Sequence, residues 1–340
     1  MSKFKRINLK IKPQSLDKLL SEYLSGHAPS RASVAKALGV SSVTSGKAMD
    51  ALISSGFMCG RIFSKNTERP ATHLLFNDSS SVLIIDLSDS IYKMCVVNPS
   101  GKTLLTLSHI YDPEITFDDN LNIFISRNGL KLKQSKVKFA TICVLYADDS
   151  RPSRLDFAVL PTISMSNYID EVIYTILGKR GASHLTVSNA VSQAVKFNVI
   201  DIDPSSRGIS YLFIGSSISS FHVYENGSVT LCSPENILSR DELADINNIP
   251  LISKEKADAL FVRLADFMDA AFSPAAIMLS SDILSPDRET SDRICHKFAL
   301  RGRAAPIIYT RDSSFPLEYI GAARYALLSV VKQYITSTKE

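Results

Sequence analysis

The 340-residue sequence predicts an α/β protein in which an N-terminal winged helix-turn-helix precedes a larger, duplicated α/β body. Three observations support this fold class. Two short amphipathic helices separated by a glycine turn are followed by two strand-like runs near the N-terminus. Further along, hairpin strands followed by alternating helices and strands occur twice. The charge also changes, because residues 1–80 hold 12 Lys and Arg against 5 Asp and Glu, whereas the rest hold 26 against 29.

Residues 30–57 predict two helices joined by a tight turn. Ser30 can cap the first helix by accepting from N–H groups that lack a partner within the helix. Gly39 follows that helix, and glycine tolerates the left-handed conformation that a sharp turn needs. Ser41 or Ser42 can cap the second helix. Its apolar positions are Val43, Ala48, Met49, Leu52 and Ile53, and we expect Ser42, Thr44, Ser45 and Lys47 to face solvent.

A helical hairpin alone is not specific, since small polar residues often only solvate a helix surface. Two neighbouring features favour a winged helix-turn-helix at residues 1–78. A helix predicted over residues 15–23 completes a three-helix core. Strands predicted over residues 57–63 and 72–76, with a turn at residues 65–67, would form the wing. Together with the basic charge of this part, the pattern predicts binding to double-stranded DNA.

The expected DNA contacts follow from the usual geometry of such modules, in which the second helix enters the major groove. Lys47 and the hydroxyls of Ser42, Thr44 and Ser45 would enter the groove, and Arg31 would contact the backbone at the first helix. Cations of the wing would contact phosphates. These wing cations are Arg61, Lys65 and Arg69.

Composition and sequence patterns argue against a membrane-spanning, secreted, zinc-binding or disulfide-bonded protein. With 45% hydrophobic and 21% charged residues the chain can bury ordinary cores. It has no run of about 18 apolar residues that could span a bilayer and no signal peptide, so we expect a cytoplasmic protein without a membrane partner. The 5 cysteines are scattered and lack the spacing of a zinc site or a disulfide set, which predicts buried free thiols.

The body is expected to form two α/β lobes, residues 79–190 and residues 191–340. In the first lobe we expect strands at 81–86, 92–98, 103–107, 138–146 and 184–187, with helices at 117–128, 166–177 and 188–197. In the second we expect strands at 211–215, 221–224, 228–231, 276–279 and 306–309, with helices at 254–272, 285–300 and 318–334. An Asn-Gly turn at residues 226–227 supports a hairpin there.

Several short segments carry a family resemblance. Residues 86–90, Asp-Leu-Ser-Asp-Ser, resemble the phosphate-binding Asp-x-Gly-x-Thr hairpin of actin-like and sugar-kinase-like ATPases, with serine in place of glycine. Residues 188–194 resemble the Glu-Asn-Asp-Ala-Asn-Ala-Ala segment of one family of repressors and sugar kinases. Residues 214–221 resemble the second, glycine-rich phosphate loop of that family. Residues 276–281 resemble a strand ending in Ile-Gly-Gly, and residues 321–323 match Gly-Ala-Ala. With the winged helix-turn-helix, this order resembles the ROK family of repressors and sugar kinases over nearly the whole chain.

The resemblance implies that kinase chemistry is lost. A phosphoryl transfer to a sugar needs a base near the hydroxyl and open backbone around the phosphates. The position of the family's catalytic aspartate is Ala190, which cannot titrate. Glycine positions hold other residues, namely Ser217, Ser219, Phe221, Ser280 and Ser281. Leu238 replaces a histidine ligand of the family's structural zinc. We therefore predict a pseudokinase, not an enzyme, with no cofactor and no metal.

The resemblance also names candidates for holding a ligand. Asn189 and Glu235 match positions that hold sugar hydroxyls in relatives, and Asp86 could assist. The alternatives are that Asn189 caps its helix and that Glu235 is merely exposed. If these residues bind a ligand, the resemblance implies a sugar or sugar phosphate as effector.

The favoured hypothesis is a homodimeric transcriptional regulator that binds a two-fold operator, its body serving dimerisation and effector binding. Two alternatives remain open. One is a sugar kinase with divergent motifs. The other is a scaffold whose winged helix binds protein instead of DNA.

Overall fold

The structure, a computed structural model, describes most of the chain. The described residues are 4–25, 30–63, 71–100, 103–148, 160–197, 208–214, 218–224, 226, 228–232, 253–280, 288–300, 307–311 and 316–337. They fall into two compact units. The first unit comprises residues 1–149, 153–199 and 318–340, and the second comprises residues 150–152 and 200–317.

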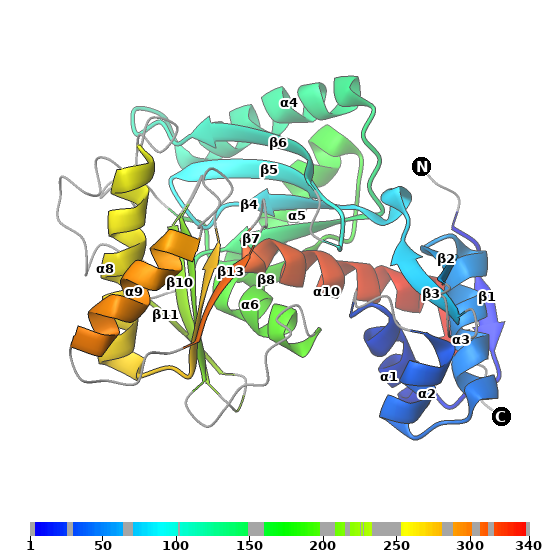
Figure 1. Cartoon of the computed structure of the whole chain (residues 1–340). Coiled ribbons are helices and arrows are strands. Elements are labelled where there is room, and N and C mark those ends of the chain that lie inside the picture. Colours follow the sequence, from blue (N-terminus) through cyan, green and yellow to red (C-terminus); the bar gives the residue numbers. More distant parts are fainter. Residues whose placement is uncertain are drawn as a thin grey trace. The chain divides into compact units, whose positions relative to one another are not determined.

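The first unit begins with three helices and a hairpin, residues 4–76, termed here the N-terminal module (Figure 1). Its elements are β1 (Ile7–Leu9), α1 (Pro13–Tyr23), α2 (Arg31–Leu38), α3 (Ser42–Ser55), β2 (Met58–Phe63) and β3 (Ala71–Phe76). Leu19, Leu20 and Tyr23 of α1 are fully buried, and α1 contacts both α2 and α3. β2 and β3 pair antiparallel, which confirms the predicted hairpin.

Local interactions set the boundaries of α2 and the start of α3 as the sequence predicts. The Ser30 hydroxyl accepts from the N–H of Ser33, and the Ser33 hydroxyl accepts from the N–H of Ser30, so the two form a capping box. Gly39 ends α2 with a φ of 62°, in the left-handed region. Ser41, one of the two predicted candidates, caps α3 by accepting from the N–H of Thr44.

A five-stranded mixed sheet, the first lobe, follows in the same unit. Its strands are β4 (Val82–Asp86), β5 (Ile91–Val97), β6 (Thr103–Ile110), β7 (Thr141–Tyr146) and β8 (Ser183–Thr186), in the order β6-β5-β4-β7-β8. β4, β5 and β6 are antiparallel, whereas β7 and β8 continue parallel to β4. Its helices are α4 (Phe117–Ser135), α5 (Ser166–Leu177) and α6 (Val187–Lys196), with 3-10 turns η1 (Asp78–Ser80) and η2 (Ile163–Met165).

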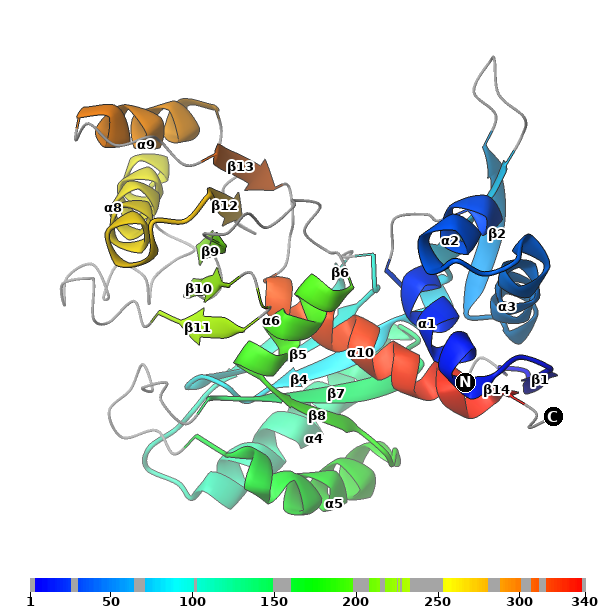
Figure 2. The ribbon, with the colours of Figure 1, turned by 90° about the horizontal axis from the view of Figure 1, so that it is seen from below.

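The buried strands of this sheet are covered on both faces. Alternate residues of β4, Leu83 and Ile85, pack in one core with Phe124 of α4 and Ile169 of α5. Figure 2 shows α4 and α5 on one face of the sheet, and α6 with α10 (Leu317–Tyr334) on the other. All five residues of β4 are buried, as its run of four apolar residues before Asp86 predicts.

The second unit repeats this topology. Its strands are β9 (Ile209–Ile214), β10 (Ile218–Val223), β11 (Val229–Leu231), β12 (Ala276–Ser280) and β13 (Ile307–Arg311), in the order β11-β10-β9-β12-β13. The first three are antiparallel, and β12 and β13 run parallel to β9. α8 (Lys254–Phe272) and α9 (Arg288–Leu300) cover the sheet through a core that includes Leu264, Ile277 and Ile294. The predicted duplication is therefore present in the strand order.

The closing helix α10 lies at the predicted residues, but from Glu318 onwards it is part of the first unit and not of the second. Gly321 explains this placement, because its backbone lies directly on α6. A Cβ built on Gly321 would be 1.9 Å from the carbonyl oxygen of Ala190 and 2.7 Å from the amide nitrogen of Ala194. Residues 191–199, expected in the second lobe, also belong to the first unit.

α10 also connects the first lobe to the N-terminal module. The buried guanidinium of Arg324 donates to the carbonyl oxygens of Pro99 and Phe197, both at 2.9 Å, and to that of Ser25, which follows α1. The strand after α10, β14 (Ile335–Ser337), pairs in parallel with β1. Tyr334 meets the ring of Phe57 edge-on at 5.7 Å.

Gly321→Ala should destabilise the protein by about 3 kcal/mol or more, because the new methyl group would collide with backbone atoms that cannot rotate away. Urea unfolding of the full-length protein measures this change.

The matched control is Gly46→Ala, also within a helix. Its Cβ would approach the Arg31 side chain, at 2.7 Å from Nε, and that flexible chain can move. Removing a helix-interior glycine gains roughly 0.5–1 kcal/mol, so this variant should be neutral or more stable. Equal losses in the free energy of unfolding in the two variants would show that the backbones of α6 and α10 are not in direct contact at Gly321.

Candidate nucleic-acid interface and kinase-like positions

The second helix of the predicted helix-turn-helix, α3, has one buried and one exposed stripe. Residues three and four apart lie on the same side of a helix. The inward stripe is Ser45, Ala48, Met49 and Leu52, all at most 2% exposed. The outward stripe is Val43, Lys47, Asp50 and Ser54, all exposed. Ser42 is also exposed and Thr44 is half-buried, with its hydroxyl 2.8 Å from that of Ser41.

Ser45 was expected to face solvent, and this prediction is wrong. Its side chain is fully buried, its hydroxyl donates to the Arg31 carbonyl at 3.0 Å, and its hydroxyl lies 2.5 Å from that of Tyr23. Tyr23 also donates to the Ser45 carbonyl at 2.9 Å. Burial raises the pKa of Tyr23 above its ordinary value, so the phenol stays protonated and able to donate. Ser45 thus joins α1, α2 and α3 and cannot read a base.

Val43 was expected to be buried, and this prediction is also wrong. Its side chain is 68% exposed. The reason is the phase of α3, since Val43 lies one turn before Lys47 on the outward stripe. Ile53 is 36% exposed as well, so the apolar residues of α3 do not all face the core.

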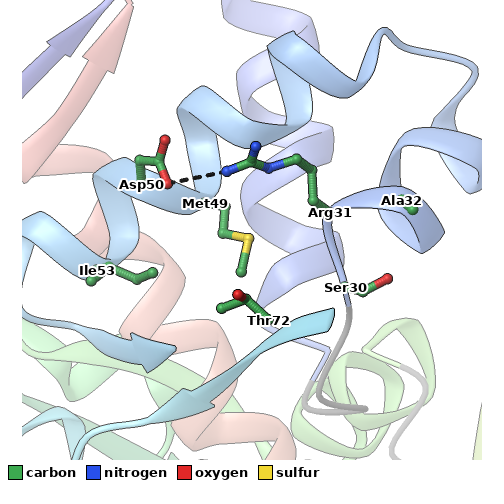
Figure 3. A pocket seen from close by; sticks show the side chains of 7 residues that line it. All are labelled: Ser30, Arg31, Ala32, Met49, Asp50, Ile53 and Thr72. Atoms are coloured by element: carbon green, nitrogen blue, oxygen red, sulfur yellow. Dashed lines mark hydrogen bonds and ion pairs between the residues drawn. The ribbon is translucent and has the colours of Figure 1, made fainter. Parts of the chain in front are cut away.

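A depression of about 340 Å³ separates α2, α3 and β3 (Figure 3). Figure 3 shows Arg31 reaching across it to Asp50, with Nη2 and Oδ1 3.5 Å apart. Both side chains are about half-exposed or more, and such surface pairs are weak. Gly46 provides the space along α3 for the Arg31 side chain. A stronger anion could therefore replace Asp50 as the partner of Arg31.

The β2–β3 hairpin is fixed next to this depression. Ser30, at the start of α2, forms an isolated antiparallel bridge with His73 of β3. Arg61 lies opposite His73 in the register of the hairpin and is exposed. The other two predicted wing cations, Lys65 and Arg69, lie outside the described residues.

Asp86, the candidate in the first β-hairpin of the body, is buried and already accepts several hydrogen bonds. Its Oδ1 accepts from the N–H of Ser88 at 2.9 Å and from the Ser88 hydroxyl at 2.6 Å. Its Oδ2 accepts from the hydroxyl of Tyr319 on α10 at 2.6 Å. Burial, followed by the Asp86 charge, raises the pKa of Tyr319 well above its ordinary value, so the phenol remains the donor. Asp86 thus fixes a turn against α10.

The start of α6 holds Asn189 and Ala190, the two residues that match the ligand-binding and catalytic positions of the family's kinases. Ala190 is fully buried beneath Gly321 of α10, whereas Asn189 is exposed. Thr186 is the N-cap, so the alternative that Asn189 caps this helix is wrong. Asp148, which is not among the predicted site residues, accepts from the N–H of Ser188 at 3.0 Å and from the Ser188 hydroxyl. The sequence shows that Asp148 directly follows a predicted strand. It indicates only weakly that this acid lies close in space to the start of a helix.

The positions in the second unit are partly described. Phe221 pairs with Tyr211 in the β9–β10 hairpin and is buried, and Ser280 ends β12 fully buried. Ser217, Ser281, Glu235 and Leu238 lie outside the described residues. Among the residues that the structure describes, no group of three or more metal-ligating side chains comes together. Within the same residues, no helix is long and apolar enough to cross a bilayer.

The two repeated sheets define the class of fold: an α/β body of the sugar-kinase and actin-like type. The chain shares its fold with the crystal structure of a ROK family transcriptional regulator, a homologue of the E. coli MLC protein. The two are 15% identical, the match covers 94% of this chain and 97% of that chain, and the TM-score is 0.55. The predicted resemblance to the ROK family is thereby confirmed as a likeness in fold.

Kinases match over about three quarters of this chain. The polyphosphate/ATP-glucomannokinase of Arthrobacter sp. strain KM is 16% identical, over 74% of this chain and 99% of that chain, with a TM-score of 0.45. A ROK family glucokinase from Streptomyces griseus is 13% identical, over 73% of this chain and 99% of that chain, with a TM-score of 0.44. These values are too low to bear on activity. No family model and no curated protein matches the sequence.

Ser45→Ala should lower the free energy of unfolding by about 1–3 kcal/mol, because it removes the hydrogen bond to the Arg31 carbonyl and leaves the buried Tyr23 hydroxyl without the Ser45 hydroxyl. Ser42→Ala, on the exposed side of the same helix, should change it by less than about 0.5 kcal/mol. Urea unfolding of both variants provides the comparison. A larger loss in Ser42→Ala than in Ser45→Ala would contradict the phase of α3.

Proposed function

We propose that this protein is a DNA-binding transcriptional regulator of the ROK type, acting as a homodimer through a winged helix-turn-helix formed by the N-terminal module. The observation that carries the proposal is the outward stripe of α3, which presents Val43 and Lys47 next to a hairpin bearing Arg61. The net charge of +7 over residues 1–80 supports it, since phosphates attract such a surface.

In this proposal α3 enters the major groove with its N-terminal half. Ser42, Thr44 and Lys47 would face base edges, and Arg31 would exchange Asp50 for a backbone phosphate. Arg61, with Lys65 and Arg69, would contact phosphates along the wing. Two copies related by a two-fold axis would bind a palindromic site.

The body would sense a small molecule without transforming it. Asp86, Asn189 and Glu235 remain the candidates for a sugar or sugar phosphate, and Asn189 is exposed as a ligand contact requires. Asp86 accepts a hydrogen bond from Tyr319 on α10. The same helix carries Arg324, which donates to the carbonyl oxygen of Ser25 in the N-terminal module. A ligand that disturbs Asp86 would therefore act directly on the helix that contacts the DNA-binding part.

The proposal predicts that the full-length protein selects a palindromic duplex from genomic fragments. Replacing Arg31 and Arg61 together with alanine should flatten the dependence of log K on log salt by up to about two units, because each lost phosphate contact removes about 0.9. Binding titrations between low and moderate salt measure the slope.

Lys131→Ala is the matched control, since Lys131 is an exposed cation of α4 outside the N-terminal module. Its slope should equal that of the unmodified protein. If the double variant keeps the original slope, neither arginine contacts phosphate. If no duplex is selected even at low salt, the scaffold alternative, in which the module binds protein, gains support.

We also predict no phosphoryl transfer from ATP–Mg to any hexose, because Ala190 cannot take a proton from a sugar hydroxyl. Ala190→Asp should not create activity, since the carboxylate would be buried against α10 and should instead lower stability. A coupled assay for ADP with a panel of hexoses tests both proteins. Turnover by the unmodified protein would establish the alternative, a divergent sugar kinase.

A further inference from the structure

Val43 is the most unusual side chain of the candidate DNA-binding face. It is the second residue of α3, and it is 68% exposed, on the same stripe as the ammonium group of Lys47. Its burial would be expected of a valine in a small domain. Its exposure is set by the inward stripe, because the buried Ser45 with its hydrogen bonds to α1 and α2 fixes the rotation of α3.

The side chains around Val43 are small, so it can approach a partner closely. Ser42 precedes it and Thr44 follows it, with the Thr44 hydroxyl held against Ser41. One turn further on, Gly46 has no side chain of its own. Val43 and Lys47 are thus the largest side chains that the first two turns of α3 present outward.

We propose that Val43 reads thymine, by packing its methyl groups on the thymine C5-methyl in the major groove. This inference rests on the proposed DNA binding and adds a specificity determinant to it. The C5-methyl is the apolar group that a base pair displays in the major groove, and it distinguishes T from the other bases. Water leaves both apolar surfaces when they meet, which favours the contact.

The chemistry of valine suits this role. Its branched Cβ holds one dominant rotamer in a helix, so the two methyl groups are presented in a fixed position before binding. Ser42 and Lys47 beside it would supply hydrogen bonds to neighbouring base edges. A thymine in each half of a two-fold site is therefore expected, at the position that faces the start of α3.

The test uses the full-length protein and a duplex selected by it from a random library. Each thymine of the selected site is replaced by deoxyuridine, which removes the C5-methyl and leaves the hydrogen-bonding edge unchanged. At one position in each half-site this change should weaken binding roughly fourfold, the effect of losing about one buried methyl group. Val43→Ala should weaken binding to the thymine duplex similarly and should no longer distinguish thymine from deoxyuridine there.

Ile62→Ala is the matched control. Ile62 is 74% exposed on β2 of the same module, so this variant also removes an exposed apolar side chain. Because Ile62 lies on the hairpin and not on α3, its removal should leave the distinction between thymine and deoxyuridine unchanged. Thermal unfolding should be unaffected in both variants, since neither side chain is in the core.

The outcomes separate this inference from the function it rests on. If a duplex is selected but Val43→Ala distinguishes thymine from deoxyuridine as well as the unmodified protein does, thymine reading by Val43 is wrong while DNA binding stands. If no duplex is selected at all, the proposed function and this inference both fall.

Discussion

The structure of the first unit depends on the close contact between α6 and α10 at Gly321. No side chain separates the two helices there, so α10 lies directly on the backbone of α6 and continues towards the N-terminal module. Arg324, one turn later, reaches three carbonyl groups from three different parts of the unit. A buried guanidinium needs such acceptors, and here they also hold the lobe and the module together.

This arrangement brings segments near the two ends of the chain into contact. β1, near the N-terminus, pairs with β14, which follows α10, and Tyr334 packs against Phe57 at the start of the hairpin. Deleting the N-terminal module would therefore expose the end of α10 and leave β14 without its partner. Point substitutions on the surface of the module separate its proposed binding role from its structural role better than a truncation does.

Elements set by local interactions could be predicted from the sequence. Ser30, Gly39 and Ser41 act within one helical turn of themselves, and the buried strand β4 begins with four consecutive apolar residues. The rotation of α3 could not be predicted, because its helix is rich in small residues that fit either face. Its phase depends on Tyr23, 22 residues before Ser45, and on the Arg31 carbonyl. The placement of α10 likewise depends on a contact far away in sequence.

The same constraint that buries Ser45 determines what α3 offers to a partner. A hydroxyl on the outer face could pair with several bases, whereas a valine there favours an apolar group. In the proposed DNA complex, the inward position of Ser45 therefore replaces an adaptable contact with a selective one, and the buried hydrogen bonds with Tyr23 stabilise that position. In this module the rotation of α3 about its own axis determines both how the three helices pack and which side chains the exposed face presents.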